Sequence, residues 1–458
     1  MNKLCTVAGR TARAARECSL GTFNRRAIGL CALGLGLSWA EIGPVHAAAG
    51  GLDLDRSVSQ FVVLDNEQRA VDEQNASKAR DSGAARPSKP EAATALDSSH
   101  NVALLPQLGY DPEVGFIAGG KFSDINFGDS HMNLDIGATQ STGGETDVNA
   151  TWGVPHVLGS DFIGLVHFQY ELRPTTDFFG LGNNNAGEKP LSQHEYHGTS
   201  LMFTLARRLA PHWVAAGTIG YDRITIGPGD PQHGKLSTTD AFSHLPGIKG
   251  GYNNPLSLSI IYNTQRDLTR PEQGWNVIGK VTHVGPELGN DFNYTRFTGD
   301  ASYVHPLGSP KRLIGFRLDG QYLTGRGNDL PFYEFSSLGG FDSLEGFYPN
   351  RFLGQSRIFA RMGYQQLLAD FDFRHIWRVR LDGTVFGGAG RVFLDRSRLP
   401  DGLMAETPSV APGLSNDIQF SYGVGLRAAL GEALSTRLDV GFSGESQALV
   451  YLSFGNAF

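Results

Sequence analysis

The chain has 458 residues, a net charge of −7 and only 19% charged residues, which already excludes several classes of protein. All three cysteines lie within the first 31 residues, so the rest of the chain can hold no disulfide framework, cysteine zinc site or cysteine nucleophile. A helical membrane protein is also excluded, because outside the N-terminus no run of about 18 apolar residues could span a bilayer as a helix.

The first 47 residues have the organisation of a secretory signal. A basic start precedes an apolar segment at 27–40 (AIGLCALGLGLSWA), and Val45-His46-Ala47 is a small-residue cleavage pattern. We predict cleavage after Ala47, with Ala49 as the next choice. A twin-arginine signal is the alternative interpretation of Arg25-Arg26, but the residues after this pair fit that pattern poorly.

A polar segment at 48–101 follows the signal. It is rich in Ala, Ser, Asp, Glu, Lys and Arg and has one short apolar patch at 61–64. Because such a segment cannot bury enough apolar surface to fold alone, we predict a disordered periplasmic tether with one short helix near Val58 to Val71. The signal holds six basic and two acidic residues, so its removal changes the net charge from −7 to −11. That balance argues against binding of nucleic acid through its phosphates.

From Val102 to Phe458 the sequence consists of segments of about ten residues that alternate apolar and polar positions, separated by clusters of Gly, Asn, Asp and Pro. In the clearest segment, 377–390, one face carries Arg378, Arg380, Asp382 and Thr384, and the other carries Val379, Leu381, Val385 and Ala389. Such alternation predicts strands with two unlike faces. The apolar face would form the core of a soluble sandwich, or would face lipid in a transmembrane barrel whose polar face lines the lumen.

Three features favour the barrel: the secretory signal, the absence of cysteine after residue 31, and a final alternating strand that carries Phe454 and ends on Phe458. A strand that ends on a C-terminal aromatic residue resembles the signal that the outer-membrane assembly machinery recognises. We therefore expect this machinery and outer-membrane lipid to be partners of the chain. Asn456 interrupts the apolar series of this strand.

We predict an all-β fold in which residues 102–458 form a closed antiparallel transmembrane barrel of sixteen strands. The strands are expected near 102–110, 114–122, 130–141, 145–155, 160–172, 195–209, 212–226, 255–266, 275–285, 293–305, 312–325, 356–369, 377–389, 417–430, 434–444 and 448–458. Long connections follow the fifth, seventh, eleventh and thirteenth strands, as expected for long surface loops opposite short periplasmic turns. This topology predicts a Gram-negative outer-membrane protein with both chain ends in the periplasm.

The tryptophans provide a test of this topology. Trp213, Trp275 and Trp377 begin odd-numbered strands, and Trp152 lies near the end of an even-numbered strand. All four should therefore lie at the periplasmic rim, where an amphipathic ring is most stable.

Several motifs resemble those of the BamA/TamA superfamily of outer-membrane proteins, also called the bacterial surface antigen family. In chain order they are 102–121 (VALLPQLGYDPEVGFIAGGK), 178–183 (FFGLGN), 262–274 (YNTQRDLTRPEQG), the loop residues Gly339, Gly340, Glu345, Gly346, Phe347 and Arg351, 385–393 (VFGGAGRVF) and 423–427 (GVGLR). The resemblance covers about residues 102–458. It implies a barrel with a loop that folds back into the lumen, and a role in insertion or export of proteins or lipids.

Two departures from the family pattern bear on function. Members that assemble or translocate proteins usually carry periplasmic POTRA domains, and the 52 residues from Gly50 to Asn101 are too few and too polar for even one. The second departure is in the loop motif, where Glu345 replaces the family's Arg and Gly388 replaces the Asp with which that Arg pairs.

We therefore predict an anchor of inverted polarity, in which Glu345 accepts hydrogen bonds from lumen-wall arginines. The candidate donors are Arg378, Arg380 and Arg427, on a wall that also carries Asp382 and Gly388. The reason is that a carboxylate buried in the lumen without a cation would be costly. The alternative is a loop tip that has left the wall, with a solvated Glu345 that contributes little.

The sequence supports no enzyme, cofactor or metal. It contains neither a G-x-S-x-G nor an H-E-x-x-H motif. His194 and His197 lie three residues apart on one predicted strand and so point to opposite faces. The lumen-facing arginines could form an anion-selective lining, but ion pairs with Asp319, Asp382 and Asp439 that hold loops in the lumen are the preferred interpretation.

Two functions remain open. The first is a barrel of the BamA/TamA type that assists insertion or export of proteins or lipids, together with a periplasmic partner protein that supplies the missing domain. The second is a passive pore or structural barrel that has lost this role. The missing POTRA domains and the altered loop motif favour the second, and the ancestry of the fold favours the first.

Overall fold

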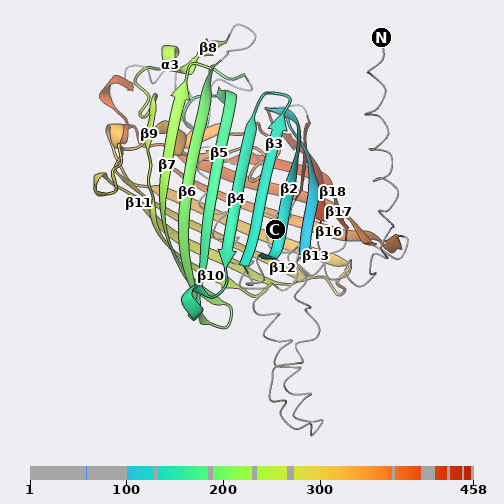
Figure 1. Cartoon of the computed structure of the whole chain (residues 1–458). Coiled ribbons are helices and arrows are strands. Elements are labelled where there is room, and N and C mark those ends of the chain that lie inside the picture. The colour runs from blue at the N-terminus through green and yellow to red at the C-terminus, as the bar shows by residue number, and fades with distance from the viewer. Residues whose placement is uncertain are drawn as a thin grey trace, which may run out of the picture.

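The computed structural model describes residues 58, 101–127, 132–183, 189–229, 235–265, 273–373, 377–403, 418–430, 434–445 and 448–454. Within them the chain forms a closed antiparallel β-barrel (Figure 1). The predicted signal at 1–47, almost all of the predicted tether, and the C-terminal Phe458 lie outside the described residues.

Sixteen strands form the wall of the barrel. They are β1 (Asn101–Asp111), β2 (Gly115–Phe127), β3 (Met132–Ser141), β4 (Thr146–Val154), β5 (Phe162–Phe178), β6 (Ser192–Ala210), β7 (Trp213–Gly227), β10 (Leu256–Asn263), β11 (Gly274–Val284), β12 (Tyr294–Pro306), β13 (Arg312–Leu323), β16 (Ser356–Phe373), β17 (Trp377–Phe393), β18 (Gln419–Leu430), β19 (Leu434–Ser443) and β20 (Leu449–Phe454). Each strand pairs with the next one around the wall, and β20 closes on β1. The predicted fold class and strand positions are confirmed.

Smaller elements extend or line the wall. Strand β8 (Leu236–Ser237) pairs parallel to β6, and β9 (Gly250–Tyr252) pairs with β7. Strands β14 (Ser336–Leu338) and β15 (Phe352–Gly354) form a separate two-stranded sheet. The β5–β6 hairpin continues beyond the predicted end of its first strand. The register shifts between Arg173 and Thr176, because Pro174 has no N–H to donate to the ladder and the chain bulges there.

The two faces of the wall differ as they do in a membrane barrel. On β18, Phe420, Tyr422 and Val424 are exposed, with Phe420 at 64%, whereas Ser421 and Arg427 point inward and are buried. Large apolar side chains therefore cover the outside and polar side chains line the interior, the reverse of a water-soluble sandwich. Among the described residues, no helix is both long and apolar enough to cross a bilayer.

One rim of the barrel carries a band of aromatic residues. The exposed Trp213 and Trp275 pack on Tyr262 and Tyr303 of the neighbouring strands, with ring centroids 4.8 and 4.5 Å apart. Trp152, near the end of β4, is also exposed and lies at the same rim by strand direction. These three tryptophans share one rim, as predicted, which we call the Trp rim; the Trp377 side chain lies outside the described residues.

Long loops pack together at the opposite rim. In Figure 1 this end carries β8, β9 and the short helix α3 (Thr238–Ala241). A cluster of buried apolar side chains includes Phe178 at the end of β5, Phe242 after α3, and Phe332 and Phe335 in the β13–β14 connection. The barrel is therefore covered at this rim by a packed cap made of its own loops.

Val58 is the one residue before 101 that the structure describes. It is fully buried against apolar side chains of the lumen wall, namely Ile163, Leu165, Ala206, Val214, Ala216, Ile261 and Ile278. These positions lie near the Trp rim, on the inward faces of β5, β6, β7, β10 and β11. At least this residue of the predicted tether thus contacts the barrel.

Candidate functional site: a loop anchored inside the barrel

The β13–β16 connection turns into the lumen at a pair of glycines. Gly339 and Gly340 follow β14 and have φ values of 113° and 85°, in the region that glycine adopts without strain. The turn is closed by a hydrogen bond of 2.9 Å from the Gly340 N–H to the Phe347 carbonyl. The residues from Gly339 to Arg351, which we call the loop tip, then return to β15.

The loop tip is buried inside the barrel. Leu344 and Phe347 pack with Leu338, Phe352, Phe359 and Val392 in one apolar cluster. The backbones also touch, because a Cβ on Gly346 would collide with the Phe442 carbonyl of β19, and a Cβ on Gly441 would collide with the Glu345 carbonyl. Glycine on both sides is therefore required for this close approach.

Glu345 forms two buried ion pairs. Its carboxylate Oε1 lies 2.6 Å from Nη1 of Arg361 on β16 and 2.5 Å from Nη2 of Arg437 on β19. The three side chains are each about 1% exposed, and Arg437 also pairs with Asp439. The tip carboxylate is therefore held by cations of the wall, the arrangement that the inverted-anchor hypothesis expects, and the solvated tip is excluded.

The predicted donors of this anchor need correction. The structure pairs Glu345 with Arg361 and Arg437, whereas Arg380 lies about 26 Å from Gly388 along β17 at about 3.3 Å per residue. Arg378 is still farther along the strand, and its side chain lies outside the described residues. Arg427 is buried and lies directly opposite Arg437 in the ladder, at the same level of the wall as the anchor.

Gly388 does occupy the wall position that faces the tip. It is directly opposite Arg361 in the β16–β17 ladder. A Cβ at this position would lie 3.3 Å from Leu344 Cδ2 and 3.2 Å from Phe359 Cε2. The space for a side chain at Gly388 is thus taken by apolar groups, and the cations that hold the tip come from β16 and β19.

A second anchor ties the base of the loop tip to the last hairpin. Arg351 forms a bidentate ion pair with Glu445, in which Nε and Nη2 each donate across 2.8 Å. Its guanidinium lies over the rings of Phe352 and Phe179, at 4.7 and 5.5 Å from their centroids. Such a planar, stacked and forked contact is specific to arginine.

The last strand also contacts the tip directly. The Tyr451 hydroxyl donates a hydrogen bond of 2.8 Å to the Phe347 carbonyl. Glu345 is bound to β19, and Arg351 is bound to the β19–β20 turn. The tip is therefore attached to the last two strands of the barrel. Phe454, which belongs to the predicted C-terminal assembly signal, pairs with Thr436 of β19 through its backbone.

The FFGLGN motif at 178–183 meets the same loop. Gly182 donates 2.7 Å to the Leu353 carbonyl, and Asn183 forms two hydrogen bonds with the backbone of Val392, at 2.6 and 2.7 Å. Phe179 stacks on Tyr348 with centroids 6.2 Å apart. Three motifs that are far apart in the sequence are therefore brought together in the lumen.

Other lumen arginines form ion pairs and hold the loop. Arg317 pairs with Asp300, and Arg357 pairs with Asp319, both at 2.7 Å. Arg357 also donates to the Ser337 carbonyl of β14, and Arg317 to the Asp342 carbonyl of the tip. Asp382 is buried on the same wall. These contacts support ion pairing rather than an anion-selective lining. The described part of the chain contains no cluster of His, Cys, Asp and Glu that could hold a metal.

Within the described residues, the strand pairing of β1 differs between its two sides. Eleven residues of β1 pair with β2, but a single pair, Tyr110 opposite Leu452, joins β1 to the described part of β20. The predicted seam between the first and last strands is present. Its pair within the described residues lies near the long-loop rim, where β1 ends.

Comparisons with known proteins agree with this geometry. A family model of the Omp85 superfamily domain matches residues 133–458. Among solved structures, BamA from Haemophilus ducreyi lacking POTRA domains 1–3 is similar, with a TM-score of 0.56, 16% identity, and coverage of 78% of this chain and 70% of that chain. CdiB from Escherichia coli gives a TM-score of 0.51 and 14% identity, with coverage of 77% and 62%. No curated protein sequence matches significantly.

Proposed function

Because the chain belongs to the Omp85 superfamily, we propose that it is an outer-membrane barrel that assists insertion or export of proteins through its β1–β20 seam. The observation that carries this proposal is the pairing within the described residues, where eleven residues of β1 pair with β2 but only Tyr110 and Leu452 join β1 to β20. A sparsely paired strand edge can bind an incoming strand, since such an edge is a template for strand addition.

The anchored loop supports the same function. The tip is bound to β19 through Glu345 and to β20 through Tyr451, so the last strand is held from inside, whereas the strand pairing of β1 within the described residues is its hairpin with β2 and one pair with β20. A substrate strand could then pair at the seam without release of β20. The Trp rim would face the periplasm, and a periplasmic partner protein would deliver substrate there. The barrel-assembly machinery would insert the chain itself.

The alternative is a passive pore or structural barrel. Replacement of the family's loop-anchor residues by Glu345 and Gly388 favours it, because this chain no longer has the same contact between loop and wall. The two functions differ in whether polypeptide reaches the seam.

Crosslinking in cells tests the proposal. A photo-crosslinking residue at Leu108, which is exposed on β1 beside the seam, should capture polypeptides, whereas the same residue at Leu318, which is exposed on β13 away from the seam, should capture few. A disulfide lock from Tyr110→Cys with Leu452→Cys should abolish the adducts until reductant is added. The body of the chain has no other cysteine, so the lock is clean.

The matched control for the lock is Val277→Cys with Ala301→Cys, which joins two strands that are already paired directly. It should leave adduct formation at Leu108 unchanged. Equal adducts at Leu108 and Leu318, insensitive to the seam lock, would favour the passive barrel.

A further inference from the structure

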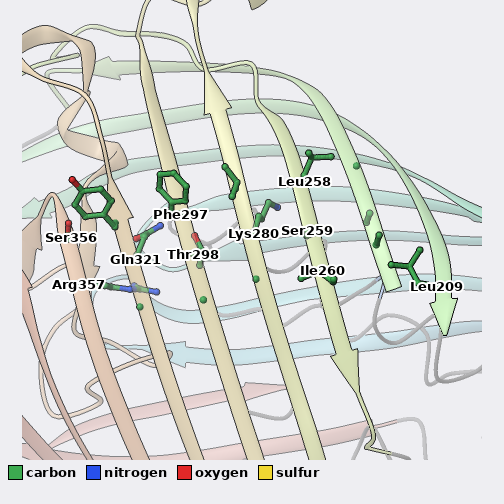
Figure 2. A pocket seen from close by; sticks show the side chains of 18 of the residues that line it. Leu209, Leu258, Ser259, Ile260, Lys280, Phe297, Thr298, Gln321, Ser356 and Arg357 are labelled. Carbon is green, nitrogen blue, oxygen red and sulfur yellow. The ribbon is translucent and has the colours of Figure 1, made fainter. Parts of the chain in front are cut away.

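The outer wall carries a hollow of about 1380 Å³ that crosses the strands from β5 to β17 (Figure 2). In Figure 2 the labelled Leu209, Ile260, Leu258 and Phe297 lie along this band of strands. We propose that the hollow binds the acyl chain of an anionic phospholipid, whose phosphate lies at Arg207. The inference does not depend on whether the seam admits substrate.

The floor of the hollow is a row brought together by strand register, in which all residues but Ile260 are small. Ala215 is opposite Ile260, Ile260 is opposite Gly279, Gly279 is opposite Gly299, and Gly299 is opposite Gly320. On β12 the neighbours of Gly299, Thr298 and Asp300, are buried in the lumen, so Gly299 faces outward. Three adjacent strands therefore present bare backbone to the membrane. We call this row, together with the larger apolar side chains that border it, the glycine furrow.

Neither backbone conformation nor packing requires glycine at these positions. Gly279, Gly299 and Gly320 are not among the glycines with positive φ. A Cβ on Gly299 would meet nothing within 4 Å, and the nearest atoms to a Cβ on Gly279 and Gly320 would be at 3.7 and 4.0 Å. Glycine weakens a strand interior, where β-branched or aromatic residues are favoured. The empty space itself is thus the feature that these residues provide.

Large apolar side chains form the flank of the furrow. Leu258, Val281, Phe297 and Tyr322 are successive cross-strand partners one row away from the floor, and all are exposed. Because neighbouring strands are about 4.8 Å apart, the furrow across β10 to β13 is about 14 Å long or more. A narrow apolar furrow of this length fits an extended hydrocarbon chain.

Arg207 supplies a cation at the end of the furrow near the Trp rim. In the ladders it is opposite Phe162 on one side and Ala215 on the other, so it continues the row of the floor. Its guanidinium lies 5.3 Å from the centroid of the Phe162 ring, and it forms no ion pair with a carboxylate of the described residues. An outward-facing arginine is costly at the lipid midplane but is stabilised at the interface by anionic lipid.

The charge of Arg207 therefore selects the ligand class. The furrow ends at the Trp rim, which faces the periplasm in the orientation proposed above. Headgroups of the periplasmic leaflet lie at this rim, and a phosphate there complements the guanidinium. We commit to a glycerophospholipid with a net negative charge, such as phosphatidylglycerol. A zwitterionic lipid or lipopolysaccharide would lack either the charge or the leaflet that this geometry requires.

Native mass spectrometry of the purified barrel tests the site. After removal of loosely bound lipid, the wild type should retain one phosphatidylglycerol when titrated with dioleoylphosphatidylglycerol. Filling the furrow by Gly279→Leu, Gly299→Leu and Gly320→Leu should reduce retention at least tenfold, and Gly299→Leu alone should reduce it measurably. Arg207→Gln should remove the preference for dioleoylphosphatidylglycerol over dioleoylphosphatidylcholine.

Two variants provide matched controls. Gly387→Leu fills an outward-facing glycine on β17 outside the furrow, where the nearest atom to a new Cβ is 3.7 Å away, and Arg312→Gln removes an exposed cation at the start of β13. Both should retain lipid as the wild type does. Equal retention by the filled variants, equal loss in the controls, or lipopolysaccharide bound in place of phospholipid would overturn the proposal. Heat-dependent gel mobility checks that each variant is folded.

Discussion

Reversal of the charge at the loop tip is the sharpest test of the anchor. In Glu345→Arg, a third guanidinium would lie where the carboxylate now contacts Arg361 and Arg437 at 2.6 and 2.5 Å. Removal of one partner of a buried ion pair costs about 3–5 kcal/mol, because the remaining charge stays desolvated. Like charges about 4 Å apart add about 4 kcal/mol per pair at an effective dielectric constant of about 20. We therefore expect the loop tip to leave the wall.

The assay is the temperature at which the folded barrel loses its fast mobility on semi-native gels. Glu345→Arg should lower this temperature strongly, and Glu345→Gln, which keeps the shape and removes the charge, should lower it less. The control is Glu287→Arg, since Glu287 is 60% exposed on a turn and its reversal should change little. Partial recovery in Glu345→Arg with Arg361→Glu would locate the effect in the pair. If Glu345→Arg melts as the parent does, the anchor contributes nothing to the barrel.

Three further changes test other parts of the structure. Arg351→Lys loses the forked contact with Glu445 and the stacking on Phe352, and we expect faster cleavage of the β13–β16 loop in limited proteolysis, with the strands unaffected. Val58→Asp places a charge in an apolar cluster and should lower the melting temperature of the barrel, whereas Val58→Leu should not. If the Trp rim is periplasmic, Ser309→Cys in the β12–β13 turn should resist a membrane-impermeant maleimide in intact cells, whereas Gly327→Cys in the long loop should react.

The strands could be predicted from the sequence because alternation is a local pattern. An alternation of period two over about ten residues can be recognised without knowing which strands are neighbours in the barrel. Each strand therefore lies close to its predicted place. The bulge at Pro174 is local in the same way, and only the continuation of the hairpin beyond it was missed. The resemblance located the loop tip at 339–351, since its two glycines and its Gly-Phe pair are adjacent in the chain.

Contacts between strands could not be predicted in the same way. The partners of Glu345 depend on which residue of β16 is opposite Gly388, and that register follows from the stagger of the whole barrel. Arg361 and Arg437 had no local signal that distinguished them from the other lumen arginines. The glycine furrow was missed for the same reason, because its three glycines are about twenty residues apart and meet only across the ladders.

The contacts of the loop tip also decide which side of the seam can move. Strand β20 is held by β19 over six residue pairs and by the Tyr451–Phe347 hydrogen bond, while the turn before it is held by Arg351 and Glu445. Within the described residues, strand β1 has its ladder with β2 and one pair with β20. Exposed, weakly held hydrogen bonds open first, so the β1–β2 hairpin should be the moving part.

Hydrogen exchange in lipid nanodiscs should therefore be faster in 101–109 than in 449–454, and Glu345→Arg should reduce this difference by releasing β19 and β20. Equal protection of the two strands in the parent protein would mean that the loop does not determine which strand opens.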